Sequence, residues 1–511
     1  MTDVDASLSA RNKIGGVSLK AKLDLPNGDT LTAISAWRFW RWSPSNDRDF
    51  TGLPITTKSQ NPSQQNQYTQ EFRYTHSGEG FDITAGLFGF YQTVRTQGTQ
   101  RLGSAASRWL LNPGNIAATY LTTPAACVTV TTRACNPATL NGLTSANDIH
   151  LDNLSVAFFT QLAGHVTDRL TIQPGLRVNY DRKKGYYNAT VTDQAGAPVG
   201  FSAGNSNTRN DQLSQMAPEL FEPRFSAWNV SFDLTARYDV TSDVHVYATY
   251  ARTFKTGGIN LNGVPAAADG TPLLEYATAK PERLNHYEGG IKTQFLNRTV
   301  TVNLAAFLTD IDDYQAIVNN GAVSALRGYV DNAGKARTKG VEWDTSWRPG
   351  DQFNVYLNGA YTDAKYLRFA NAPCPPELSG GGTGMPIGAS GAPGANSPAT
   401  CDISGAPLPG LSKWSLSYGG EFNQPVGTLF GKDAQVYVGV DGNFRTRFSS
   451  NASPSAYTWI ARYALTNVRA GLRTDLGIDI YGWVRNAFDV KYFADIFPVF
   501  SDKILEFKNS R

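Results

Sequence analysis

Hydrophobic and polar residues alternate strictly along one stretch, RLTIQPGLRVNYD, which spans residues 169–181. Every second position is apolar or aromatic, and the positions between are polar, charged or glycine. Because side chains of a β-strand alternate between its two faces, this pattern predicts a strand with one apolar and one polar face. A soluble strand averages about 5–6 residues, whereas a tilted strand needs about 9–11 residues to cross a membrane. The length of the run favours a transmembrane strand.

Similar runs recur along the chain, and the connections between them alternate in length. Short turns are expected at 26–29, 77–80, 164–168, 239–243, 296–298, 348–352 and 474–477, with a somewhat longer one at 425–433. Long polar loops are expected at 43–67, 98–150, 183–225, 256–281, 313–336, 365–410 and 447–459. About 16 strands joined in this way predict an all-β fold, a transmembrane antiparallel β-barrel with its long loops at one end.

Composition and charge add little to this picture. The 511 residues carry 46 basic and 43 acidic side chains, and the net charge of +3 suggests no nucleic-acid partner. The mean hydropathy of −0.32 is compatible with a barrel, because only one face of each strand meets lipid and the loops are polar. The first residues, MTDVDASLSARNK, are polar and do not resemble a signal peptide.

Four cysteines form two pairs that are close in the sequence. Cys127 and Cys135 bracket one loop-like segment, and Cys374 and Cys401 bracket another. A zinc site would need tighter spacing with cysteine or histidine, so we expect two loop disulfides and an oxidising compartment. Four unrelated free thiols are the alternative.

Polar positions of the clearest strand are candidates for the barrel lumen. Arg177, Asn179 and Asp181 share its polar face and could hydrogen-bond an internal plug or a passing polar ligand. The alternative is that they solvate the wall or pair with neighbouring lumen charges.

A basic pair ends another strand-like run, VYATYARTFKTGGIN at 246–260. A phosphate-binding loop is one interpretation of Arg252, Lys255 and the two glycines that follow. In a barrel, the run instead climbs from the short turn at 239–243, and both side chains reach the extracellular rim. There they could extend toward water or lipopolysaccharide phosphates, and Gly257 and Gly258 would release the chain into a long loop.

Five segments, in order along the chain, resemble segments of TonB-dependent outer-membrane receptors. They are VYATYARTFKTGGIN (246–260), HYEGGIKTQFLNRTVTVNLAAFLTDIDDYQ (286–315), NAGKARTKGVEWDTSWRPGDQFNVYLNGAYTDAKY (332–366), DISGAPLPGLSKWSLSYGGEF (402–422) and GWVRNAFDVKYF (482–493). The fourth has Leu411 and Ser412 where the family usually has a proline, and Ala487 in the fifth replaces a leucine. The resemblance covers about 14–493.

The resemblance implies a 22-stranded barrel around an N-terminal plug. The first and last strands appear to start and end on the long-loop side, so residues 1–511 are expected to be an incomplete barrel domain without signal peptide, plug or TonB-coupling box. The implied function is active uptake of a scarce nutrient, foremost a ferric siderophore, across the outer membrane of a Gram-negative bacterium. The implied partners are outer-membrane lipid, lipopolysaccharide and, in the full-length protein, the TonB complex.

Other functions have weaker support. A passive porin also fits a barrel of about 16 strands, but the five motifs and the positions of the chain ends argue against it. The chain contains neither HExxH nor GxSxG, and GTLFGK (427–432) is one residue too short between its glycines for a phosphate-binding loop. We therefore expect no enzyme, no metal centre and no cofactor.

Overall fold

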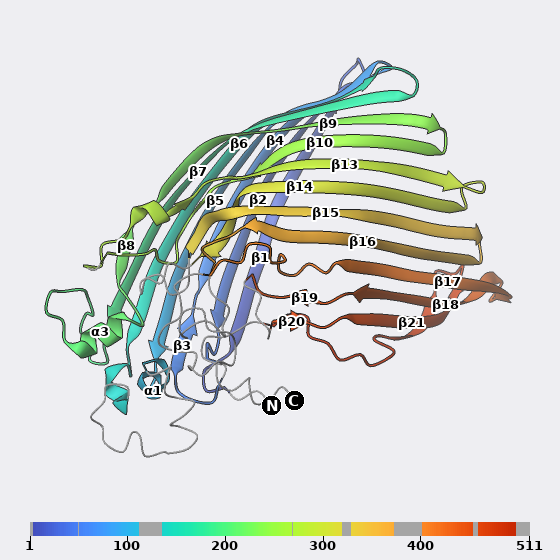
Figure 1. Cartoon of the computed structure of the whole chain (residues 1–511). Coiled ribbons are helices and arrows are strands. Elements are labelled where there is room, and N and C mark those ends of the chain that lie inside the picture. Colours follow the sequence, from blue (N-terminus) through green and yellow to red (C-terminus); the bar gives the residue numbers. More distant parts are fainter. Residues whose placement is uncertain are drawn as a thin grey trace.

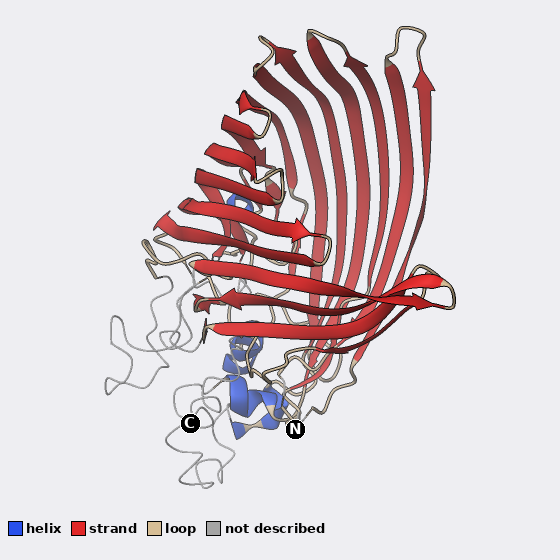
Figure 2. Cartoon of the chain, turned by 90° about the vertical axis from the view of Figure 1, so that its right-hand side faces the viewer, coloured by secondary structure: helices blue, strands red, loops and turns tan. Residues whose placement is uncertain are grey.

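The computed structural model describes residues 4–49, 51–111, 135–267, 269–318, 329–372, 401–452 and 458–496. Its main element is one large antiparallel sheet, and Figure 2 shows the sheet as a strongly curved wall. No helix in these ranges is long and apolar enough to cross a membrane.

Sixteen long strands form the wall, which confirms the predicted number. They are β1 (Ser9–Asp24), β2 (Thr30–Ser45), β4 (Ser63–Ser77), β5 (Phe81–Leu102), β6 (Thr144–His165), β7 (Leu170–Thr192), β9 (Arg224–Thr241), β10 (Val244–Lys255), β13 (Glu282–Phe295), β14 (Val300–Val318), β15 (Tyr329–Gly350), β16 (Phe353–Arg368), β17 (Trp414–Leu429), β18 (Lys432–Arg445), β21 (Tyr463–Thr474) and β22 (Asp479–Val484). Each pairs antiparallel with the next in this order. Within the described residues, the edge strands β1 and β22 do not pair with each other.

Shorter elements lie in the long loops. They are β3 (Thr56–Gln60), β8 (Glu219–Phe221), β11 (Gly258–Ile259), β12 (Thr278–Ala279), β19 (Phe448–Ser449), β20 (Trp459–Ile460), α1 (Ala106–Leu110), α3 (Asn207–Leu213) and the 3-10 turns η3 (Pro137–Thr139) and η4 (Leu274–Tyr276). The helices α1 and α3 lie at the end of the sheet where the N-terminus also lies (Figure 1).

Several strands are longer than the sequence pattern indicates. β5, β6 and β15 each have 22 residues and β7 has 23, well beyond the about 9–11 that cross a membrane. The predicted loops 98–150 and 183–225 therefore begin too early, because polar residues at their ends continue the backbone ladder. The predicted turn at 425–433 is also too long: β17 and β18 meet across Phe430 and Gly431, with a register shift between Pro425 and Gly427. A proline is tolerated in a strand at such an irregularity.

One face of the wall is apolar and exposed. On β9, Trp228, Val230, Phe232 and Leu234 point to this side, and Trp228 is 70% exposed. The register places Phe232 opposite Leu176 of β7, and it aligns Leu87 of β5 with Phe158 of β6 in the same way. We call this side the outer face and its exposed apolar residues the apolar belt. An exposed apolar surface that continues over many strands is typical of a lipid-facing barrel wall.

Aromatic side chains border the apolar belt at its long-loop side. This aromatic girdle contains Trp37, Tyr68, Tyr91, Tyr180, Trp228, Tyr250 and Tyr287. Tyr180 and Trp228 are opposite each other with ring centroids 5.0 Å apart, and so are Tyr250 and Tyr287. Aromatic girdles mark the interfaces between hydrocarbon and water in membrane barrels. The sequence-based expectation of such a girdle is met at the long-loop side.

The buried hydrophobic core lies in the loops rather than between strands. One cluster joins Ile55, Leu102, Ala106, Leu140, Leu143, Val191, Val199, Leu213 and Met216, and a second is built around Tyr366 and Phe369. Both clusters draw residues from several long loops. The loops are therefore packed onto one another and form a structured cap at one end of the wall.

The alternation of β7 reverses where the strand enters this cap. Up to Asp181, odd-numbered residues are polar and even-numbered residues belong to the outer face. Further along, the odd-numbered Tyr187, Ala189 and Val191 are buried against the loops, whereas Arg182 and Lys184 on the outer face are exposed. The reversal places the upper limit of the apolar belt between Tyr180 and Lys184.

A charge on the outer face should therefore destabilise the protein in a bilayer more than a charge on the opposite face. We expect Val230→Arg to lower the free energy of unfolding by about 2–4 kcal/mol, because it places a guanidinium in hydrocarbon. Ser231→Arg, on the polar face of the same strand, is the matched control and should cost less. The measurement is urea unfolding of the chain in lipid vesicles, followed by tryptophan fluorescence. Equal losses in the two variants would contradict the assignment of faces.

Candidate functional site

The predicted lumen residues lie together on the inner face of β7, opposite the apolar belt. Arg177 is partly buried, whereas Asn179 is 7% and Asp181 5% exposed. Their position follows from the period of two, since they alternate with Leu176, Val178 and Tyr180. The structure thus brings the three residues to one face; their role in a lumen stays a prediction.

Neighbouring strands supply partners for these side chains. Arg177 Nε donates to Asn179 Oδ1 at 2.7 Å, and the Arg177 guanidinium lies 5.6 Å and 5.8 Å from the ring centroids of Phe88 and Phe159. Asn179 Nδ2 donates to Ser155 Oγ at 3.3 Å. These contacts fit the alternative interpretation, in which the polar residues pair with other groups of the wall.

The two basic residues expected at the rim lie on opposite faces. Arg252 is opposite Phe232, so it projects from the outer face at the edge of the apolar belt. Lys255 follows three residues later and therefore projects from the inner face. Its Nζ is 3.2 Å from Oε1 of Glu282, which is buried. The position of Arg252 suits contact with lipid phosphates, whereas Lys255 already has an anionic partner within the protein.

A buried lysine adjoins this inner-face ion pair. Lys183 Nζ donates to the backbone oxygen of Gly257 at 2.5 Å. A Cβ at Gly257 would lie 2.4 Å from the Phe225 ring and 2.5 Å from the Ala279 oxygen, closer than real Cβ contacts. Gly257 is therefore required by close packing at the start of the loop, and not only as a flexible release point.

A second charged network on the inner face was missed by sequence reasoning. Arg469 pairs with Glu421 at 2.9 Å and with Asp441 at 3.1 Å, and Arg473 lies 3.6 Å from Glu421 and 3.5 Å from Asp479. These residues come from β17, β18, β21 and β22. The signal was present in the sequence, because Asn467, Arg469 and Arg473 occupy alternate positions of one strand. Such a network can hold a polar inner wall in register or meet a charged ligand.

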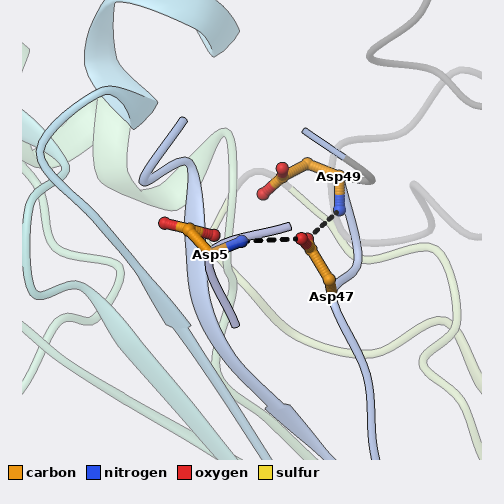
Figure 3. A group of neighbouring side chains, drawn as sticks. All are labelled: Asp5, Asp47 and Asp49. Atoms are coloured by element: carbon orange, nitrogen blue, oxygen red, sulfur yellow. Dashed lines mark hydrogen bonds between the residues drawn. The ribbon is translucent and has the colours of Figure 1, made fainter. Parts of the chain in front are cut away.

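Three carboxylates at the long-loop end could hold a cation. Atoms of Asp5, Asp47 and Asp49 that could be ligands lie within 4.8 Å of one another, and Asp47 and Asp49 are 1% and 3% exposed (Figure 3). The backbone amides of Asp5 and Asp49 donate to Asp47 at 3.3 Å and 3.2 Å. Asp49 also accepts hydrogen bonds from Thr51 and from the Thr56 amide, and burial raises the pKa of its carboxyl. These bonds give the group a structural role in ordering the loop, and we assign it no metal.

The cysteines are only partly within the described residues. Cys135 and Cys401 are disulfide-bonded. Cys127 and Cys374 lie outside the described residues, so the expected pairings stay predictions.

Glu219 of β8 is a buried acid that links two long loops. It is 7% exposed, and its carboxylate accepts from the Val264 amide, with oxygen distances of 3.3 Å and 3.2 Å. Tyr187, Ala189, Phe221, Val264 and Ala277 form the surrounding apolar cluster. Burial raises the Glu219 pKa to about 7, against which the Val264 hydrogen bond acts only partly. The contact between these loops therefore includes a group that titrates near neutral pH.

Comparison with a family model gives a match over most of the chain. Residues 4–487 match the model described as TonB dependent receptor-like, beta-barrel. Among curated proteins, the pesticin receptors of Yersinia enterocolitica and Yersinia pestis are 28% identical over 206 residues. That match covers 40% of this chain but only 25% of the length of each relative.

Solved structures with the same fold are also receptors or transporters. The ferric yersiniabactin uptake receptor FyuA from Yersinia pestis has a TM-score of 0.65 at 18% identity, covering 96% of this chain and 58% of its own. The copper transporter OprC has a TM-score of 0.58 at 12% identity, and the siderophore receptor PiuA from Acinetobacter baumannii has 0.56 at 13%. Each of these two matches covers 95% of this chain and 61% of the other. At these identities the similarity establishes the fold.

The Glu219 carboxyl should make the contact between the two loops pH-dependent. Its pKa is raised by folding from 4.5 to about 7, so its contribution to stability is fully present below pH 4.5 and is lost as the pH rises through about 7. The loss is at most about 3 kcal/mol. Amide hydrogen exchange at Val264, corrected for intrinsic rates, should report greater protection at pH 5 than at pH 8. Glu219→Gln keeps an acceptor without the charge, and a pH dependence unchanged in this variant would contradict the assignment.

Proposed function

Because the chain belongs to the TonB-dependent receptor-like β-barrel family, whose members are receptors and transporters rather than enzymes, we propose that it forms the wall of a receptor for energised nutrient uptake. The observation that carries the proposal is the family match over residues 4–487 together with the two-faced wall. An apolar belt suits a lipid environment, and the inner face offers polar groups such as Arg177 and Arg469.

The wall would work together with a plug domain and the TonB complex of the inner membrane. Residues 1–511 would supply the barrel part of the receptor, and a plug inside a 22-stranded barrel would receive the pull of TonB. The coverage of FyuA, 58% of its chain, is compatible with this division. The polar inner residues Arg177, Asn179 and Asp181 would then face the plug or a passing ligand.

The membrane would be the outer membrane of a Gram-negative bacterium. Its lipid would contact the apolar belt, and lipopolysaccharide would meet the long-loop side. The outward position of Arg252, close to the aromatic girdle, supports a contact with lipid phosphates.

The substrate we propose is a ferric siderophore complex. Support comes from the names of structural relatives: FyuA is a ferric yersiniabactin uptake receptor and PiuA a siderophore receptor. OprC is named as a copper transporter, so a copper ligand is included in the test below.

A passive porin has less support than a receptor. A porin of sixteen strands would close β22 onto β1, and the described residues contain no such pairing. The comparisons reported above name receptors and a transporter.

Deletion of the gene in its own bacterium provides the test. Under iron limitation the deletion strain should lose growth and radioactive iron uptake with one ferric siderophore out of a panel, and the restored full gene should return both. Uptake should also stop when TonB is removed, because the transport is energised. Cobalamin, haem, copper and oligosaccharides complete the panel. Uptake that continues without TonB would support the porin and contradict the receptor.

A further inference from the structure

Three exposed basic side chains lie on the outer face directly above the apolar belt. They are Arg182 and Lys184 of β7 and Arg224 of β9, and we call them the basic patch. All three follow the reversal of alternation on β7, where the inner face becomes buried in the loop cap. Their side chains therefore point away from the protein and are available to a partner outside the wall.

The register brings like charges together in this patch. Lys184 lies directly opposite Arg224, and Arg182 lies one same-face step, about 7 Å, from Lys184. Like charges on directly opposite residues destabilise a sheet. An arrangement that costs stability in the isolated protein is favourable when an anion lies between the two side chains.

Nearby acids do not neutralise the patch. Asp152 of β6 is opposite Lys184 and accepts a hydrogen bond from the Tyr91 hydroxyl at 3.3 Å. Glu222 lies 3.8 Å from Arg224, and both side chains of that pair are largely exposed. Within the described part of the chain, Arg182 and Lys184 form no ion pair. An exposed pair such as that of Arg224 contributes little and can be exchanged for a stronger anion.

Apolar and aromatic surface continues directly below the patch. Tyr180, which precedes Arg182 by one same-face step, packs against the exposed Trp228, and Val178 and Val230 follow toward the centre of the belt. The outer face of β7 and β9 thus presents, in order, aliphatic, aromatic and cationic groups. A phosphorylated lipid has the same order, with acyl chains below and phosphates at the interface.

We propose that Arg182, Lys184 and Arg224 bind the phosphate groups of lipopolysaccharide, the phosphorylated glycolipid, while its acyl chains lie against Val178, Val230 and Trp228. The proposal rests on the outer-membrane location proposed above and adds a site to it. Guanidinium groups bind phosphate oxygens in a bidentate manner, and the ammonium of Lys184 adds a point charge. A free phosphate ion would lack the apolar part of the interaction, so a lipid fits the surface better.

A charge-removing variant tests the site. The purified full chain in detergent is titrated with fluorescent lipid A, with the same lipid A after removal of its phosphates, and with phosphatidylglycerol. The triple variant Arg182→Gln, Lys184→Gln, Arg224→Gln should bind lipid A about tenfold to a hundredfold more weakly, since each basic group near a membrane surface contributes about 1 kcal/mol. The dephosphorylated form should bind the native chain and the variant equally weakly, and phosphatidylglycerol should bind more weakly than lipid A.

A matched control removes the same charge at the opposite end of the wall. The variant Arg169→Gln, Arg298→Gln, Arg348→Gln changes three exposed arginines near short turns and should bind lipid A like the native chain. Equal weakening in both variants, an unchanged affinity in the patch variant, or full competition by inorganic phosphate at equal concentration would overturn the proposal. Binding in detergent is independent of uptake, so a chain that binds lipid A through the patch but supports no import would disprove the transport function alone.

Discussion

The whole structure depends on one constraint, which is that backbone polar groups in hydrocarbon must be paired within the protein. An antiparallel ladder satisfies this requirement strand by strand, and it also fixes the period of two that separates an apolar from a polar face. The strict alternation of β7 and β9 is the direct result. Lipid can contact Leu176 and Val230 because the same strands hide Asn179 and Asp181 on the other side.

The end of the lipid contact is written into the same strands. Once β7 has passed Tyr180, its outer face becomes charged and its inner face becomes the apolar wall of the loop cap. The long loops therefore do not hang free of the barrel. They share buried clusters that include Val191, Leu213 and Tyr366, and they bury acids such as Asp49 and Glu219. The cap is the part of the structure where ligand specificity and sensitivity to pH can arise.

Local pattern predicted the strands and the short turns well, because both depend on residues that are neighbours in the sequence. It failed where distant segments meet. The polar ends of β5 and β7 looked like loops although they continue the ladder, and the Arg469 network joins four strands. Arg252 and Lys255 were treated as a pair although their spacing of three residues places them on opposite faces. The packing role of Gly257 depends on Phe225 and Ala279, which no local pattern indicates.

Accessibility of spin labels along β7 is the most direct test of the two-faced wall. Single cysteines at positions 174 to 184, in a background without the native cysteines, would carry a nitroxide in a chain reconstituted into lipid vesicles. Collision rates with oxygen, which concentrates in hydrocarbon, and with a water-soluble nickel complex would then be compared. The account predicts high oxygen accessibility at 174, 176, 178 and 180, low values at the odd positions between, and a change to nickel accessibility at 182 and 184. Equal nickel accessibility along all even positions, or no two-residue period, would contradict it.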